Sequence, residues 1–289
     1  AVKMHKAYFS LSKNLLPMPT NKRVHSFTDD ILSDLDGVAL AELIRKKEIT
    51  SQEVVAAAIA RAQKVEPVLN AVVTPQFERG LEAAKQPTEG FFAGLPIFFK
   101  DLTFFEGEKT YFGTEALANA KPQKATDPIA KQILAQGFIN IGTSSMPEFG
   151  LGCTTEFPSA KPTPNPWNTG HSVGGSSGGA GALVAAGVVP IAHSADGGGS
   201  TRIPASCCGL VGLKATRGRL LRSGLFKSQV VDVAIDGVIT RTVRDTAHFY
   251  AEAEKYYKNP KVKPMGLVTG PSNRKFKIGF TADSVQGRG

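Results

Sequence analysis

The sequence has few cysteines and no long apolar run, and each lack excludes a class of protein. Its three cysteines, Cys153, Cys207 and Cys208, cannot all pair with one another, and their spacing fits no zinc site. They indicate reduced residues and a reducing, cytoplasmic compartment. No stretch reaches the ~18–20 apolar residues of a membrane span, so we expect a protein without a membrane partner.

Acidic residues are scarce at the two ends of the chain. Residues 1–30 carry five lysines or arginines against two aspartates, and residues 255–289 carry eight against one. The middle of the chain holds 21 basic and 22 acidic residues, so the formal net charge of +9 comes from the ends. A protein that reads nucleic acid needs its basic residues on the folded surface. The charge distribution therefore argues against nucleic acid as a partner.

Residues 1–30 also lack a helical period and an apolar core. A secretory signal needs ~7–15 apolar residues after a basic start, and none follows here. The lack of acids before Asp29 would suit a transit peptide, although arginine is nearly absent. We therefore expect an N-terminal arm over residues 1–30 and a single domain over residues 31–289. With 42% hydrophobic residues, the chain can bury a substantial core.

Helical signals recur from Val38 onward. Apolar spacing predicts a short helix over residues 38–44, and Thr50 with Glu53 has the form of a capping box before the next helix. Asp127 followed by Pro128 predicts a helix start. A further helix is expected over residues 242–257.

Short apolar runs between these helices predict strands at residues 69–73, 95–99, 138–141, 188–192 and 275–280. Strands that alternate with helices are typical of an α/β fold. We therefore expect a mixed β-sheet core flanked by helices on both faces.

Two glycine–serine clusters, GGSSGG at 174–179 and GGGS at 197–200, flank an apolar segment. Glycine lets the backbone approach a ligand closely, so these clusters suit a site where backbone N–H groups converge on one atom. A flexible linker is the alternative. Against it, residues 180–192 are apolar and long enough for one buried helix followed by a strand.

Two polar residues lie in or beside predicted apolar strands. Lys100 follows the apolar residues PIFF at the carboxyl end of a strand, where ligand sites of open α/β sheets lie. A lysine that extends to the surface is the ordinary alternative, and the stretch by itself favours it. For His193 we expect a hydrogen-bonded core side chain.

Several long motifs, taken together, resemble the amidase signature family. They are GLPIFFKDLT at 94–103, PEFGLGCTTE at 147–156, PTPNPWN at 162–168, GGSSGG at 174–179, GGSTRIPAS at 198–206 and CGLVGLK at 208–214. The resemblance covers about residues 31–289 and is nearest to hydrolases of amino-acid-type and nylon-oligomer amides. Members usually continue well past the position of Gly289, so the resemblance implies a chain that lacks the C-terminal part of the fold.

The resemblance also implies a serine–serine–lysine site. It assigns Ser200 as the nucleophile, Ser176 as the bridging serine after a cis peptide bond, and Lys100 as the base. The separation between the two serines is the one expected in the family. Burial disfavours a charged amine, so we expect a lowered pKa at Lys100.

An oxyanion hole follows from the same resemblance. It would use the backbone N–H groups of Gly197, Gly198, Gly199 and Ser200, with Gly150 on the substrate side. Gly197 departs from the bulkier residue usual at that position, and the three-glycine run predicts a looser hole. The resemblance as a whole implies an amidase that acts on a small-molecule amide without a cofactor or metal. A homodimer is one assembly that we expect.

Alternative functions remain open. Ser176 and Ser177 both satisfy G-x-S-x-G, the nucleophile elbow of α/β-hydrolase esterases, and Asp245 and His248 follow in the required order. However, the elbow needs an apolar strand before it, and residues 168–173 are polar. A catalytically incomplete fragment, or an amidotransferase subunit that acts on charged tRNA with partner chains, is the other alternative.

Overall fold

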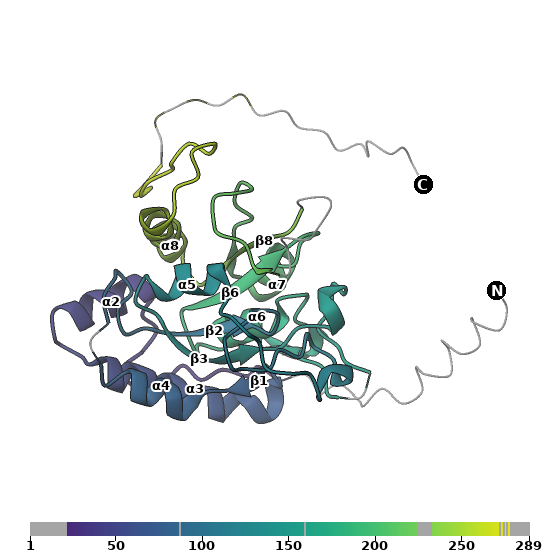
Figure 1. Cartoon of the computed structure of the whole chain (residues 1–289). Coiled ribbons are helices and arrows are strands. Elements are labelled where there is room, and N and C mark those ends of the chain that lie inside the picture. Colours follow the sequence, from purple (N-terminus) through teal and green to yellow (C-terminus); the bar gives the residue numbers. More distant parts are fainter. Residues whose placement is uncertain are drawn as a thin grey trace.

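Two three-stranded sheets form the centre of the molecule in the computed structural model, which describes residues 22–86, 88–158, 160–224, 233–271, 273, 275 and 277 (Figure 1). The first sheet has the order β1 (Val72–Pro75), β3 (Ile139–Ser144), β2 (Pro96–Lys100). The second has the order β6 (Ile191–Asp196), β8 (Ile235–Thr240), β7 (Val211–Gly212). Strands β2 and β6 lie side by side, so the two sheets meet edge to edge.

The strands run in mixed directions. Strand β2 is parallel to β3, whereas β1 and β3, β6 and β8, and β7 and β8 are antiparallel pairs. A separate antiparallel pair joins β4 (Pro164–Asn165) and β5 (Asn168–Ser172). The expected mixed sheet of an α/β fold is confirmed.

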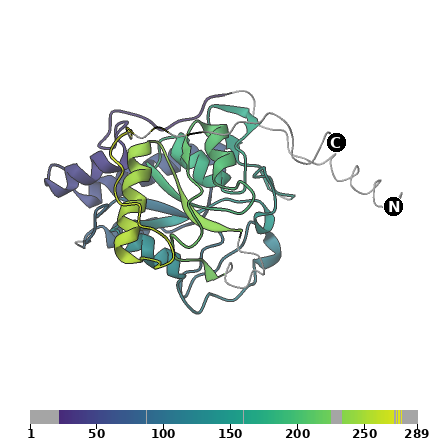
Figure 2. The ribbon, with the colours of Figure 1, turned by 90° about the horizontal axis from the view of Figure 1, so that it is seen from above.

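Helices flank these strands (Figure 1). Helices α3 (Ser51–Leu69) and α4 (Phe77–Ala83) lie below the strands in that view, and α5 (Pro128–Leu134) and α8 (Val243–Tyr256) lie above them. Seen from above, α8 crosses over the strands (Figure 2). The other helical segments are α2 (Gly37–Arg45), α6 (Gly178–Ala185), α7 (Arg202–Cys208) and the 3-10 turns η2 (Glu115–Leu117) and η3 (Glu148–Gly150).

The apolar core joins these layers. It extends from α3 through both central sheets to α8. Helix α6 packs on β6 and has all eight of its residues buried, as an entirely apolar helix requires. None of the helices in the described part of the chain has the length and apolar character to cross a membrane.

The helix starts follow the sequence signals. Thr50 and Glu53 form the predicted capping box, with Thr50 Oγ1 accepting from the Glu53 N–H and the Glu53 carboxylate accepting from the Thr50 N–H. Helix α5 begins at Pro128 as predicted, but the Asp127 side chain does not cap it. The Asp127 carboxylate instead accepts from the backbone N–H groups of Phe104 and Gly224, which are distant in sequence.

The predicted strand bounds need correction. The strand predicted at 69–73 starts too early, because α3 continues to Leu69 and Asn70 ends it in a left-handed conformation. Strand β3 continues to Ser144, beyond the predicted end at residue 141. The strand predicted at 188–192 is shifted, because β6 starts at Ile191 and ends at Asp196. The polar ends of both strands are buried but hydrogen-bonded, so they stay in the sheet. Strand β8 was not predicted, and the strand expected at 275–280 falls largely outside the described residues.

The segment before the first helix lies against the domain. The Val24 N–H donates to the Pro166 carbonyl and the Ser26 N–H to the Ala186 carbonyl, and Ser26 is fully buried. This is the described end of the expected arm, whose residues 1–21 lie outside the described part. The boundary at residue 30 stays a prediction.

Candidate active site

Strand β2 carries Lys100 to a buried position next to a serine. All five residues of β2 are buried, and the Lys100 side chain is 1% exposed. Its Nζ donates to Ser176 Oγ at 2.7 Å. Ser176 follows a cis peptide bond after Gly175, as the resemblance implies. The structure therefore brings two of the three expected catalytic side chains into contact.

The surroundings of Lys100 lower its pKa to about 7. Burial is the largest cause, because a charged amine loses its hydration, and the negative charges of Asp236 and Asp196 partly oppose it. Near neutral pH a large share of Lys100 is thus the neutral amine. The lowered pKa expected from the sequence is confirmed, and the alternative of a surface lysine is wrong.

The loop that holds Ser200 leaves the end of β6 and leads into α7. It packs on the GGSSGG segment, since the Ser177 N–H donates to the Ser200 carbonyl at 3.1 Å. Within the described residues, the backbone N–H groups of Gly197, Gly198, Gly199 and Ser200 donate to no protein acceptor. Four unengaged donors in one loop can bind an anionic oxygen.

Asp196 anchors this loop at its base. The carboxylate accepts from the Arg202 guanidinium in two bonds of 2.9 Å and from the Thr201 N–H at 3.1 Å. Lys214 Nζ lies 3.3 Å from Asp196 and donates to the Gly197 carbonyl at 2.5 Å. Burial by itself would raise the Asp196 pKa, but these hydrogen bonds outweigh it and lower the pKa to about 2. Asp196 is therefore charged at neutral pH and fixes both ends of the glycine run.

Gly150 lies beside the proposed bridging serine. It has a φ of +69°, and a Cβ added to it would stand 3.4 Å from Ser176 Oγ and 3.2 Å from Met146 Cε. Met146 belongs to a small apolar cluster with Leu102, Ala195 and Ala234. Glycine suits this positive φ and leaves the space next to Ser176 Oγ without a side chain.

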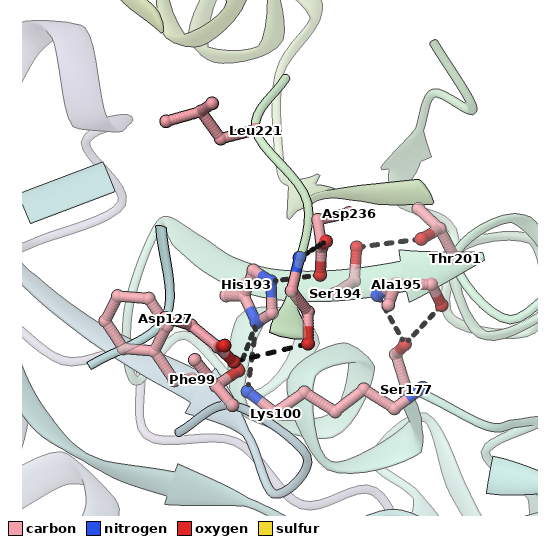
Figure 3. Close-up of polar contacts among 12 residues, drawn as sticks. Phe99, Lys100, Asp127, Ser177, His193, Ser194, Ala195, Thr201, Leu221 and Asp236 are labelled. Atoms are coloured by element: carbon pink, nitrogen blue, oxygen red, sulfur yellow. Dashed lines mark hydrogen bonds and ion pairs between the residues drawn. The ribbon is translucent and has the colours of Figure 1, made fainter. Parts of the chain in front are cut away.

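The esterase alternative is wrong, because its residues are engaged elsewhere. Ser177 Oγ lies 3.3 Å from both the N–H and the carbonyl of Ala195 (Figure 3). The Asp245 carboxylate accepts from the N–H groups of Gly37 and Val38 at the start of α2. His248 stacks on Phe91 with ring centroids 4.5 Å apart.

A family model described as Amidase matches residues 53–287. The chain belongs to the amidase family. A protein of Mycobacterium tuberculosis named amidase AmiC is 46% identical over 265 residues, which are 91% of this amidase-family chain and 56% of that relative. The 6-aminohexanoate-cyclic-dimer hydrolase of Paenarthrobacter ureafaciens is 42% identical over 216 residues, which are 73% of this chain and 44% of that one.

Solved structures agree with this assignment. A structure of 6-aminohexanoate cyclic dimer hydrolase matches with a TM-score of 0.72 and 37% identity, covering 86% of this chain and 50% of that one. The resemblance to the amidase signature family is confirmed. The amidase-family chain spans about half the length of the curated relatives it matches.

Sequence reasoning missed the charged residues around the site of this amidase-family chain. Arg202 and Lys214 lie within the quoted motifs. The one sequence feature that could have pointed to them is a charged residue among glycines and apolar residues. Their pairing with Asp196 is visible only in the fold. Asp236 comes from the unpredicted strand β8, so no sequence signal pointed to it.

Proposed function

We propose that this chain carries the catalytic residues of an amide hydrolase, with Ser200 as the nucleophile, Ser176 as the bridge and Lys100 as the base. The observation that carries the proposal is the buried 2.7 Å hydrogen bond between Lys100 Nζ and Ser176 Oγ. It pairs a serine hydroxyl with an amine whose pKa is lowered to about 7, near the optimum for a base at neutral pH. The loop that holds Ser200 contacts the same segment.

In the proposed acylation, the neutral amine of Lys100 accepts the Ser176 hydroxyl proton while Ser176 Oγ accepts the proton of Ser200. Ser200 Oγ then attacks the amide carbon, and the C=O π electrons move to oxygen. The N–H groups of residues 197–200 donate to this oxyanion. Losing one such donor typically costs ~10²–10³ in rate.

Collapse of the tetrahedral intermediate breaks the C–N bond. The proton held by Lys100 returns through Ser176 to the leaving nitrogen, so ammonia or an amine departs and an ester on Ser200 remains. Water attacks that ester with the same relay as base, which releases the carboxylic acid and restores Ser200.

We infer a small-molecule amide as the substrate, processed without a cofactor in the cytoplasm. The hydrolase relatives named for the 6-aminohexanoate cyclic dimer support a small amide. The three cysteines are free, which fits a reducing compartment.

Covalent labelling with a fluorophosphonate tests the assignment, read by intact mass and peptide mapping. We expect a single adduct on Ser200, retained in Ser177→Ala and accompanied by release of ammonia or amine from a panel of small amides. An adduct that maps to Ser176 or Ser177 would overturn the assignment.

A further inference from the structure

His193 on β6 connects the strand of the proposed base to a buried carboxylate (Figure 3). Its Nδ1 lies 3.2 Å from the main-chain nitrogen of Lys100, and its Nε2 lies 3.3 Å from Asp236 Oδ1. The side chains of His193 and Asp236 have no exposed surface. The catalytic assignment uses neither residue.

The contacts define which ring nitrogen carries the proton. A main-chain N–H can only donate, so Nδ1 must present its lone pair to Lys100. The proton of a neutral ring then lies on Nε2, where the Asp236 carboxylate accepts it. Thr103 Oγ1, 3.3 Å from Nδ1, can donate to the same lone pair. A neutral His193 with its proton on Nε2 therefore satisfies every partner.

Asp236 is itself held in place. Its Oδ2 accepts from the Ser223 N–H at 3.0 Å, and Ser223 Oγ donates to Asp127 Oδ2 at 3.2 Å. Asp127 also accepts from the Phe104 N–H in the loop that follows Lys100. This chain of contacts closes on itself and ties β2, β6 and β8 together.

Titratable groups near the pair come from several parts of the chain. Lys100 ends β2, Asp196 ends β6, Asp127 precedes α5, and the buried Tyr250 lies on α8. The Asp236 and Asp196 charges favour the protonated form of Lys100, against the effect of burial.

We propose that His193 and Asp236 form a positioning pair for the base of this site: His193 holds the end of β2 through the Lys100 N–H, and Asp236 fixes the imidazole tautomer and places a negative charge near the Lys100 amine. The inference rests on the proposed function, because it names the groups that position its base.

Two substitutions at His193 separate the two ring contacts. His193→Asn puts a side-chain oxygen close to the position of Nδ1 and keeps an acceptor for the Lys100 N–H. His193→Gln can reach Asp236 but removes that acceptor. We expect fluorophosphonate labelling of Ser200 near the wild-type rate in His193→Asn and about 10- to 100-fold slower in His193→Gln, since small displacements of a catalytic group have effects of this size.

His248→Asn and His248→Gln are the matched controls, because His248 contacts Phe91 and not the site. Both should label at the wild-type rate. Equal labelling rates in the two His193 variants would overturn the link through the Lys100 N–H.

Asp236→Asn tests the charge. The label reacts when Lys100 is neutral, so its rate rises with pH through the Lys100 pKa. Removing the Asp236 charge disfavours the ammonium, and the midpoint of the acid limb should move to lower pH. Asp245→Asn, which neutralises a buried carboxylate on α8, should leave the midpoint unchanged. If Asp236→Asn labels more slowly but its midpoint is unshifted, Asp236 has only a structural role. That result would overturn the proposal that its charge acts on the Lys100 amine.

The tautomer gives a readout that does not need activity. In ¹⁵N NMR spectra of the chain at neutral pH, His193 should show an unprotonated Nδ1 and a protonated Nε2. The opposite tautomer would overturn the pair, even where Ser200 labels normally. A wild-type chain without an adduct on Ser200, but with this tautomer, would reject the proposed function and leave the His193–Asp236 contact standing.

Discussion

The two sides of the proposed site are built in opposite ways. On the Lys100 side the polar groups are buried, and Lys100, His193 and Asp236 all have protein partners. On the Ser200 side the backbone donors of the loop have no protein acceptor among the described residues. A lysine must lose hydration to be neutral near pH 7, whereas an oxyanion hole must keep its donors free for the substrate. Burial therefore suits one side and would disable the other.

The loop of residues 197–200 is anchored at both of its ends, although its backbone donors are free. Asp196, Arg202 and Lys214 bind its ends, while a Cβ at Gly198 would meet no atom of the described residues within 4 Å. Gly198 therefore has room beside its Cα among the described residues, whereas a Cβ at Gly199 would stand 2.8 Å from Ile203 Cδ1.

The largest effect should come from removing the nucleophile. Ser200→Ala should abolish both the covalent adduct and amide turnover, since the proposed acyl bond forms on its hydroxyl. Its unfolding free energy should stay within ~0.5 kcal/mol of the wild type, because a partly exposed side chain is lost. Intact mass and urea unfolding measure the two. Residual turnover equal to the wild type would mean that another nucleophile is used.

Lys100→Met removes the proposed base on the buried side of the site. We expect the rate of fluorophosphonate labelling at Ser200 to fall by ~10²–10⁴. The substitution should also stabilise the fold. Because the folded pKa of about 7 lies below the ordinary value of 10.5, the unfolded state binds more protons between pH 7 and 10, and burial of Lys100 destabilises the fold most at and below pH 7.

Methionine removes that destabilisation, although it leaves Ser176 Oγ without its partner. We expect a gain on the order of 1–3 kcal/mol near pH 6–7 that shrinks toward pH 10, measured by urea unfolding across this range. A gain that is the same at every pH would show that Lys100 is not buried as a neutral amine.

Gly199→Ala should distort the backbone of the loop that holds Ser200 without removing a functional group. Gly199 has a φ of +140°, and an added Cβ would stand 2.8 Å from Ile203 Cδ1. We expect a ~10- to 100-fold slower labelling of Ser200 and a loss of ~1–3 kcal/mol in stability. Gly198→Ala, where a Cβ has room, should lose clearly less stability. Equal losses in thermal or urea unfolding would contradict the loop geometry.

The smallest effect concerns the anchor of the loop. The Asp196 pKa of about 2 lies below the ordinary 3.8, so its bonds stabilise the fold above about pH 4, and this contribution is lost as the pH falls through 2. Asp196→Asn should cost about 1–2 kcal/mol at pH 7, a value reduced because Arg202 is half exposed. In urea unfolding the difference from the wild type should vanish between pH 4 and 2. A constant difference over that window would mean that the charge is irrelevant.

The strands show why sequence reasoning succeeded only in part. Strand β2 was predicted almost to its end, because four apolar residues precede Lys100. Strand β3 was predicted too short, and the strand predicted at 188–192 was placed too early along the chain. Each strand ends in polar residues such as Ser144 and Asp196, which a surface strand would expose. These residues are buried with partners, which no apolar pattern can reveal.

By itself the sequence determined the local features: the helix starts at Thr50, Pro128 and Thr242, and the glycine runs beside Ser176 and Ser200. Caps and glycine conformations depend on neighbours within a few residues, so they can be predicted from the sequence alone. Only the tertiary structure decided that Lys100 is buried against Ser176 and that His193 connects its strand to Asp236. Desolvation and long-range hydrogen bonds arise only when β2, β6 and β8 pack together, and they set the pKa on which the proposed chemistry depends.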